Sequence, residues 1–152
     1  MLQFVQMLAG VLLALFTLPL LRAIGYFSEK TKFTLLLLVF PVLYIFIAWW
    51  TGQRVGPEMW GLLLYGNIAV FGYGTSLSII AVGMMGHSVW DVLHYTREIV
   101  TIVPSWYIFV CAGYNLAMGT YVFGRWRHYV RENKEEVRRR KRAAMEQLQQ
   151  EG

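Results

Sequence analysis

Three side chains that can bind a metal ion or a proton, His87, Asp91 and His94, stand close together in an otherwise apolar stretch of the chain. Asp91 is the only charged residue between Phe71 and His94. Burying an ionisable group in a bilayer costs on the order of 2.5 to 3.5 kcal/mol, so an interaction at this position must offset the cost. Spacings of four and three residues place all three side chains on one face of a helix. The pattern predicts a polar stripe on a buried helix.

A second polar face is predicted on the helix that follows. Tyr107, Cys111 and Asn115 are spaced by four residues and therefore share one side of a helix. At a rise of 1.5 Å per residue, the two faces match in depth if the helices are antiparallel neighbours. Asn67, on the preceding helix, lies near the same level and is expected to close the pocket as a further ligand-binding group. The expected pairs are His94 with Tyr107, Asp91 with Cys111, and His87 with Asn115.

Three kinds of chemistry fit this polar stripe. Imidazole and carboxylate groups bind zinc, copper or iron, and either His87 with Asp91 or Asp91 with His94 can chelate one ion. A second possibility is a hydrogen-bonded cluster that joins helices. A third is a proton relay, or a haem or chlorin held through one histidine. Ligation of a haem by two histidines is not expected within the pocket, because the remaining histidine, His128, follows the last apolar segment.

Long uncharged runs set the class of protein. Of the 152 residues, 57% are hydrophobic and 16% aromatic, and no charge occurs in residues 1–21, 33–51 or 59–90. A run of about 20 such residues spans a bilayer. The interval 58–95 would measure about 57 Å as one helix, so it must hold two spans with a turn near Thr75 and Ser76. The sequence predicts an all-α integral membrane bundle (1–124) of five transmembrane helices, at about 2–21, 33–51, 58–73, 77–96 and 104–124.

Basic residues orient these spans, because cytoplasmic segments of membrane proteins collect Lys and Arg. With five alternating spans, one side receives Arg22, Lys30, Lys32 and nine basic residues of the tail, whereas the other receives Arg54 and Arg97. We therefore expect a bacterial inner-membrane protein with its N-terminus outside and its C-terminus in the cytoplasm. Five of the six tryptophans then fall near the two interfaces, where aromatic belts form: Trp49, Trp50, Trp60 and Trp106 outside, and Trp126 inside.

The C-terminal tail, residues 125–152, differs sharply from the rest of the chain. Residues 125–150 contain no Gly or Pro, so the last helix is expected to continue into the cytoplasm. The tail holds nine basic and five acidic residues, a net charge of +4 out of +5 for the chain. The basic cluster 138–142 is expected to lie near anionic headgroups or to dock a partner protein. Nucleic-acid binding is not expected, because one short basic helix tethered to a membrane is a weak sign of it.

Two stretches carry a resemblance to a known family: AVGMMGHSVWDVLHY at 81–95 and VPSWYIFVCAGYNLAMG at 103–119. They resemble an uncharacterised family of small bacterial multi-span membrane proteins, a domain of unknown function with a His-x-x-Trp-Asp-x-x-His motif. The similarity extends more weakly over 31–124 and leaves out the tail. Tyr95 and Asn115 stand where that family tends to have a histidine and an aspartate, which lowers the number of ligands for a second metal. The resemblance implies the architecture and the site, but no reaction.

The residues favour an accessory role over independent catalysis, because no nucleophile paired with a base and no soluble catalytic domain is recognisable. We expect a small integral membrane subunit of a larger complex, contacting the bilayer and other subunits, with an intramembrane metal or cofactor site. One alternative is a metal-dependent enzyme acting on a lipid or isoprenoid, with Asp91 as ligand or base and Tyr107 or Cys111 assisting. A transporter or proton-conducting protein is the other alternative, although five spans without a repeat lack the usual inverted symmetry.

Overall fold

The computed structural model describes residues 1–96 and 103–151, with the backbone alone at His94 and at 143, 144 and 146–151. All regular secondary structure in these residues is helical, which confirms the all-α prediction. The described residues form five helices, and their order along the chain is α1 (Leu2–Ala23), α2 (Glu29–Trp50), α3 (Gly56–Gly74), α4 (Leu77–Tyr95) and α5 (Ser105–Glu151).

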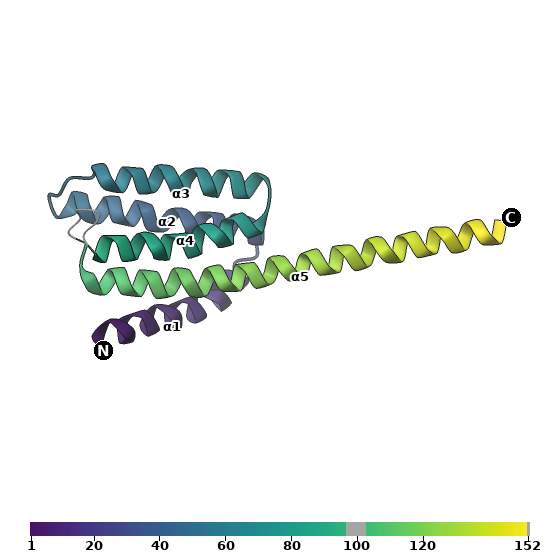
Figure 1. Ribbon diagram of the computed structural model, residues 1–152, viewed down its shortest axis with the longest axis horizontal. Coiled ribbons are helices and arrows are strands. Elements are labelled where there is room, and N and C mark those ends of the chain that lie inside the picture. The colour runs from purple at the N-terminus through teal and green to yellow at the C-terminus, as the bar shows by residue number, and fades with distance from the viewer. Residues whose placement is uncertain (97–102, 152) are drawn as a thin grey trace.

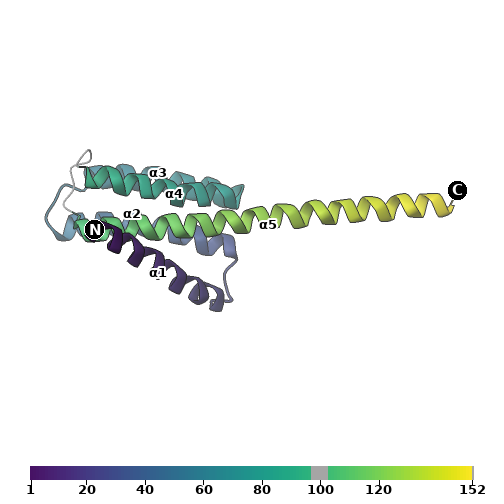
Figure 2. The ribbon, with the colours of Figure 1, turned by 60° about the horizontal axis from the view of Figure 1, so that its bottom comes forward.

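The helices form an up-and-down bundle from which one helix projects. α2, α3, α4 and the first part of α5 lie side by side, and α5 then continues far beyond them (Figure 1). α5 packs against both α1 and α4, while α3 packs against α2 and α4. α1 is inclined to the other helices (Figure 2). The α1–α2 and α3–α4 connections lie at the end where α5 leaves the bundle, and the N-terminus lies at the opposite end (Figure 1).

Local sequence signals account for the helix ends. Ser28 caps α2 by accepting a hydrogen bond from the Thr31 amide at 3.1 Å, so α2 begins before the predicted start at residue 33. Gly52, with φ of 69°, turns the chain after α2 in a conformation that side chains with a Cβ avoid. Pro57 lies in the first turn of α3, where its missing N–H costs no helical hydrogen bond. Ser76 accepts a bond from the Ser78 amide at the start of α4.

Two glycines allow α1 to approach α5 closely. A Cβ on Gly10 would lie 2.0 Å from the Val110 carbonyl oxygen, and a Cβ on Gly113 would lie 2.1 Å from the Met7 carbonyl oxygen. Real side chains do not tolerate such distances, so only hydrogen fits at either position. Small residues permit the same close backbone contact between helices in membranes. The α1–α5 contact fixes the rotation of α5 about its axis and thereby the direction of its polar face.

Two of the described helices, α1 and α2, are long and apolar enough to cross a membrane, and α4 contains a shorter apolar segment, Leu77–Leu93. α3 and α4 each have 19 residues, which corresponds to about 28 Å, close to the thickness of the bilayer core. The predicted positions of all five helices match the observed ones to within a few residues, apart from the earlier start of α2, and α5 continues through the tail as expected. Their membrane placement stays a prediction.

α5 is one continuous helix of 47 residues, as expected from the lack of Gly and Pro in the tail. Its exit from the bundle is held by Glu29 at the start of α2. Arg125 donates to the Glu29 carboxylate at 3.1 Å and the Tyr129 hydroxyl donates to it at 2.9 Å. The hydrogen bond to Glu29 raises the pKa of the Arg125 guanidinium, which therefore stays charged. Beyond this contact, residues 131–142 are all exposed.

Candidate metal centre

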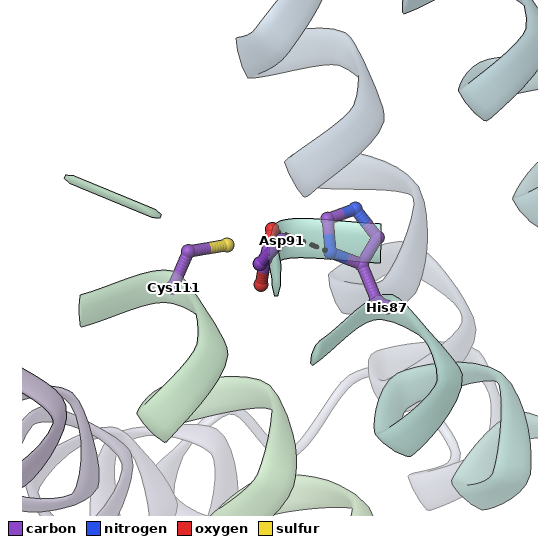
Figure 3. Close-up of side chains that lie close together, drawn as sticks. All are labelled: His87, Asp91 and Cys111. Carbon is purple, nitrogen blue, oxygen red and sulfur yellow. Dashed lines mark ion pairs between the residues drawn. The ribbon is translucent and has the colours of Figure 1, made fainter. Parts of the chain in front are cut away.

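A buried polar cluster lies where α2, α4 and α5 meet. α4 supplies His87 and Asp91, one helical turn apart, and α5 supplies Cys111. These three side chains are 1%, 0% and 2% exposed. Asp91 lies between the Cys111 thiol and the His87 imidazole (Figure 3). A nitrogen, an oxygen and a sulfur donor therefore converge inside the bundle.

The spacing of the three donors fits a single small ion. One ligand atom from each of His87, Asp91 and Cys111 lies within 4.8 Å of the other two, and His87 Nδ1 is 3.4 Å from Asp91 Oδ1. A tetrahedral ion with bonds of about 2.0 to 2.3 Å separates its ligand atoms by about 3.3 to 3.8 Å. A contraction of about 1 Å would therefore complete three corners of such a site. Mixed imidazole, carboxylate and thiolate donors suit zinc, copper or iron.

Two further side chains hold the donors in position. The Tyr44 hydroxyl, from α2, donates to Asp91 Oδ1 at 2.6 Å. The Asn115 amide donates to Cys111 Sγ at 3.2 Å and lies 3.4 Å from His87 Nδ1. Loss of a group that orients a ligand in this way typically lowers metal affinity about 10- to 100-fold.

The cluster cannot satisfy its own hydrogen bonds. His87 Nδ1 lies 3.4 Å from both the Asp91 carboxylate and the Asn115 amide nitrogen. The carboxylate can only accept and the amide NH₂ can only donate, so one protonation state of Nδ1 serves only one of them. If Nδ1 carries the proton, it donates to Asp91, and the Asn115 amide keeps its hydrogen bond to Cys111 Sγ but has no acceptor on the imidazole.

Unpaired polar atoms confirm this deficit. Among the described residues, the buried side-chain N and O atoms without a hydrogen-bond partner are Asp91 Oδ2, the Tyr107 hydroxyl oxygen and Asn115 Oδ1. All three belong to this cluster. Each such atom costs about 1 to 3 kcal/mol, and more if it is charged. A bound cation would supply the partner that a carboxylate and two neutral oxygens lack.

Aromatic rings surround the His87 imidazole. The ring centroid of Tyr65 lies 4.6 Å from that of His87, and those of Tyr44 and Phe40 both lie at 5.8 Å. Tyr107 packs edge-on against Tyr44 with centroids 5.4 Å apart. This close packing excludes bulk water and strengthens electrostatic interactions inside the site. It favours a small ion over a haem or chlorin as the group held by His87.

The structure brings most of the predicted site residues together. His87, Asp91, Cys111 and Asn115 are neighbours, and the expected His87–Asn115 and Asp91–Cys111 proximities are present. Tyr107 also lies at the cluster, beside Tyr44. The His94 side chain, which was predicted as a metal ligand and as the partner of Tyr107, lies outside what the structure describes.

Asn67 does not close the pocket. Its side chain is exposed and donates to the Leu63 carbonyl oxygen of its own helix at 2.6 Å. Counting residues along the helix axis gave the correct depth for the site residues of α5. The same count gave a depth for Asn67 on α3 but not the direction in which its side chain points around the helix. The rotation of α3 directs Asn67 away from His87 and Tyr65 towards it.

Tyr44 is the site residue that the sequence analysis missed. It lies about 9 Å from the end of α2 at Trp50, and Asp91 lies about 6 Å from the end of α4 at Tyr95. The same count of depth would therefore have placed the Tyr44 hydroxyl near the carboxylate. The residue was overlooked because a tyrosine in an aromatic run such as 40–50 gives no distinctive signal.

Comparison of the chain with protein-family models, with curated proteins and with solved structures finds no match. The resemblance to a family of small multi-span membrane proteins therefore stays a prediction.

Proposed function

We propose that this chain is a small integral membrane subunit of a larger complex, and that its five-span bundle binds one transition-metal ion at His87, Asp91 and Cys111. The carrying observation is the buried Asp91 carboxylate, which has one oxygen without a partner and lies between imidazole and thiol donors. Bare burial of a carboxylate is strongly unfavourable, and a bound cation offsets that cost directly.

Apolar side chains on the outside of every helix support the membrane placement. Soluble monomers rarely expose contiguous apolar patches larger than a few hundred Å². Here the exposed apolar residues occur on all five helices of the bundle. They are therefore not confined to α1 and α2, the two helices that are long and apolar enough to cross a membrane. Examples are Phe4 and Phe16 on α1, Val42 and Phe46 on α2, Leu63 and Val70 on α3, Val82 and Val89 on α4, and Trp106 and Leu116 on α5.

The charge distribution supports an orientation with the C-terminus in the cytoplasm. The bundle end that α5 leaves carries Arg22, Lys30 and Lys32, together with the basic tail. The opposite end carries Arg54. Since cytoplasmic ends collect basic residues, the tail side is assigned to the cytoplasm and the N-terminus to the outside.

Metal content tests the proposal. Protein purified in mild detergent without chelator should carry about one zinc, copper or iron ion per chain, measured by plasma mass spectrometry. Asp91→Asn and Cys111→Ser should each lower metal affinity at least about tenfold, because the first removes the anionic carboxylate and the second the sulfur ligand while each nearly preserves the side-chain volume. Asn67→Ala is the matched control, a polar residue of the same bundle outside the cluster, and its metal content should equal that of the wild type.

The same variants distinguish a metal centre from a cluster that only joins helices. If the wild type carries no stoichiometric metal and Asp91→Asn is neutral or stabilising, the metal proposal is wrong and the cluster is structural. The sequence-based prediction for His94 is tested in parallel, since His94→Ala should also reduce bound metal if His94 supplies a fourth ligand.

A second candidate, a metal-dependent enzyme acting on a lipid or isoprenoid, is favoured by one observation. An apolar groove of about 380 Å³ lies between α3 and α4, and one of its walls is Tyr65, whose ring packs on His87. A hydrocarbon chain in this groove would lie one side chain away from the cluster. The lining residues are Leu64, Tyr65, Ile68, Ser78, Ile79, Val82, Gly83 and Gly86.

A further inference from the structure

The part of α5 beyond the bundle carries a stripe that the metal centre does not explain. Val130, Lys134, Val137, Lys141 and Met145 are spaced by four, three, four and four residues, so they lie within about 80° on one side of the helix. Val137 and Met145 are 45% and 57% exposed, and both lysines are exposed. We call these five residues the tail stripe. Apolar and cationic side chains alternate along it.

The tail stripe is separate from the contacts that hold α5 to the bundle. Arg125 and Tyr129 contact Glu29 at the bundle end, and the tail then projects away from the other helices (Figure 1). The ion pairs found within the described part of the tail, His128–Glu132 and Glu136–Arg140, lie outside the stripe, the first on the opposite side of the helix and the second nearer its flank. Exposed valine and methionine between lysines therefore form a continuous, accessible surface.

Distance argues against the bilayer as the binding partner, given the proposed membrane placement of the bundle. If the span ends near Gly124, Lys134 lies about 15 Å and Lys141 about 26 Å beyond it along the helix axis. The Debye length at physiological salt is about 8 Å, so the field of the headgroups falls to a few per cent at Lys141. The outer half of the stripe therefore needs a partner in the cytoplasm.

Charge argues against a second copy of the same chain. Two copies inserted in the same orientation would bring their tails together in parallel. Lys134 and Lys141 would then face their own counterparts, and like charges in such positions destabilise a helix pair. Nucleic acid is a poorer fit as well, because Val137 and Met145 offer phosphates nothing to contact.

We propose that the tail stripe binds an amphipathic helix of an acidic partner protein, in which apolar residues and carboxylates alternate at the same spacing. Val137 and Met145 would pack against the apolar residues of that helix, and the two lysines would pair with its carboxylates. This combination of apolar anchors and complementary charges sets both affinity and orientation in helix pairs. The proposal identifies the tail as the segment through which the membrane protein joins a complex.

The test uses the full chain in nanodiscs of zwitterionic lipid and a synthetic helical peptide with Leu and Glu alternating at the stripe spacing. Binding is measured by fluorescence anisotropy. The acidic peptide should bind at least about tenfold more tightly than a peptide with Lys in place of Glu, because the charges of the stripe attract one and repel the other. Lys134→Glu with Lys141→Glu should weaken binding of the acidic peptide about tenfold.

The matched control is Arg139→Glu with Arg142→Glu, which changes the net charge equally but lies away from the stripe. It should weaken binding less than about threefold. Equal losses in the two double variants, or equal binding of the two peptides, would overturn the proposal in favour of a diffuse basic tail.

Anionic discs containing phosphatidylglycerol test the membrane as competitor. A fluorophore at position 143, on the opposite side of the helix from the stripe, should stay remote from a headgroup acceptor in both kinds of disc. If energy transfer in the anionic discs shows that the fluorophore lies at the membrane surface, and peptide binding is lost there, the stripe binds lipid and the proposal is wrong. These outcomes do not depend on the metal centre, because the amount of bound metal is measured separately on the same protein. If the membrane placement is wrong, the protein will not insert into the discs.

Discussion

The two halves of α5 are continuous in structure but differ in what holds them helical. Between Ser105 and Gly124 the helix contributes buried residues such as Cys111, Tyr114 and Met118, and its backbone contacts α1 at Gly113. From residue 131 to 142 every side chain is exposed. The first half is stabilised by packing against α1 and α4, whereas the second depends on helix propensity and on pairs such as Glu136–Arg140. Continuity of a helix therefore says little about where its stability originates.

This difference predicts how each half responds to substitution. Large destabilisation requires overpacking, a cavity or an unpaired buried group, and those conditions exist only where the helix is buried. Changes in the tail should instead affect binding and leave folding nearly unchanged. Three substitutions in the molecule, each with a partner of the same type in an exposed setting, test the underlying contrast between buried and exposed positions.

The largest effect is expected for Gly113→Leu. A Cβ at this position would meet the Met7 carbonyl oxygen at 2.1 Å, so α1 and α5 must separate. We expect a loss of about 3 kcal/mol or more, because two backbones must move. Thermal unfolding in detergent, together with protease sensitivity of α1, measures it.

Gly124→Leu is the control, because it lies on the same helix and a Cβ there meets nothing within 4 Å. It should be neutral or slightly stabilising, since leucine favours the helix over glycine. Equal destabilisation by both substitutions would contradict the assignment of the loss at Gly113 to the close contact with α1.

An intermediate effect is expected for Tyr44→Phe. This change removes the hydroxyl that donates to Asp91 Oδ1 at 2.6 Å, while Asp91 Oδ2 already has no partner. The expected loss is about 1 to 3 kcal/mol in metal-free protein. Tyr26→Phe, at a side chain that is 98% exposed, should have no measurable effect on thermal unfolding. An unchanged stability in Tyr44→Phe would mean that this hydrogen bond does not support the bundle.

The smallest effect is expected for the ion pair at the root of the tail. Glu29→Gln weakens the bonds from Arg125 and Tyr129, but both charged partners are about one-third exposed, at 36% and 33%. Solvent screening limits the loss to below about 1 kcal/mol, and added salt should reduce it further. Glu136→Gln, in the exposed pair with Arg140, should change stability by still less. A loss from Glu136→Gln as large as that from Glu29→Gln would show that the tail contributes to folding.

Much of the candidate site followed from periodicity alone. The spacing of His87 and Asp91 placed them on one face, and the rise per residue predicted that Cys111 and Asn115 would meet them. Asn67 failed the same reasoning, because a count of residues gives depth along the axis but not the direction of a side chain around it. Tyr44 was missed because a tyrosine within the aromatic run 40–50 gives no distinctive signal, although the count of depth would have placed it near Asp91.

Composition and residue order were sufficient for the number of helices, their approximate ends, the polar face of α4 and the continuation of α5 into the tail. These properties depend on local interactions, namely hydrogen bonding within each helix and the periodic exposure of its faces. The rotation of each helix depends instead on its neighbours. Contacts such as Gly113 against Met7 and Tyr65 against His87 determine it, and they join residues far apart in the chain. The convergence of three donors on one point is therefore a property of packing, because it requires several helices to be rotated correctly at once.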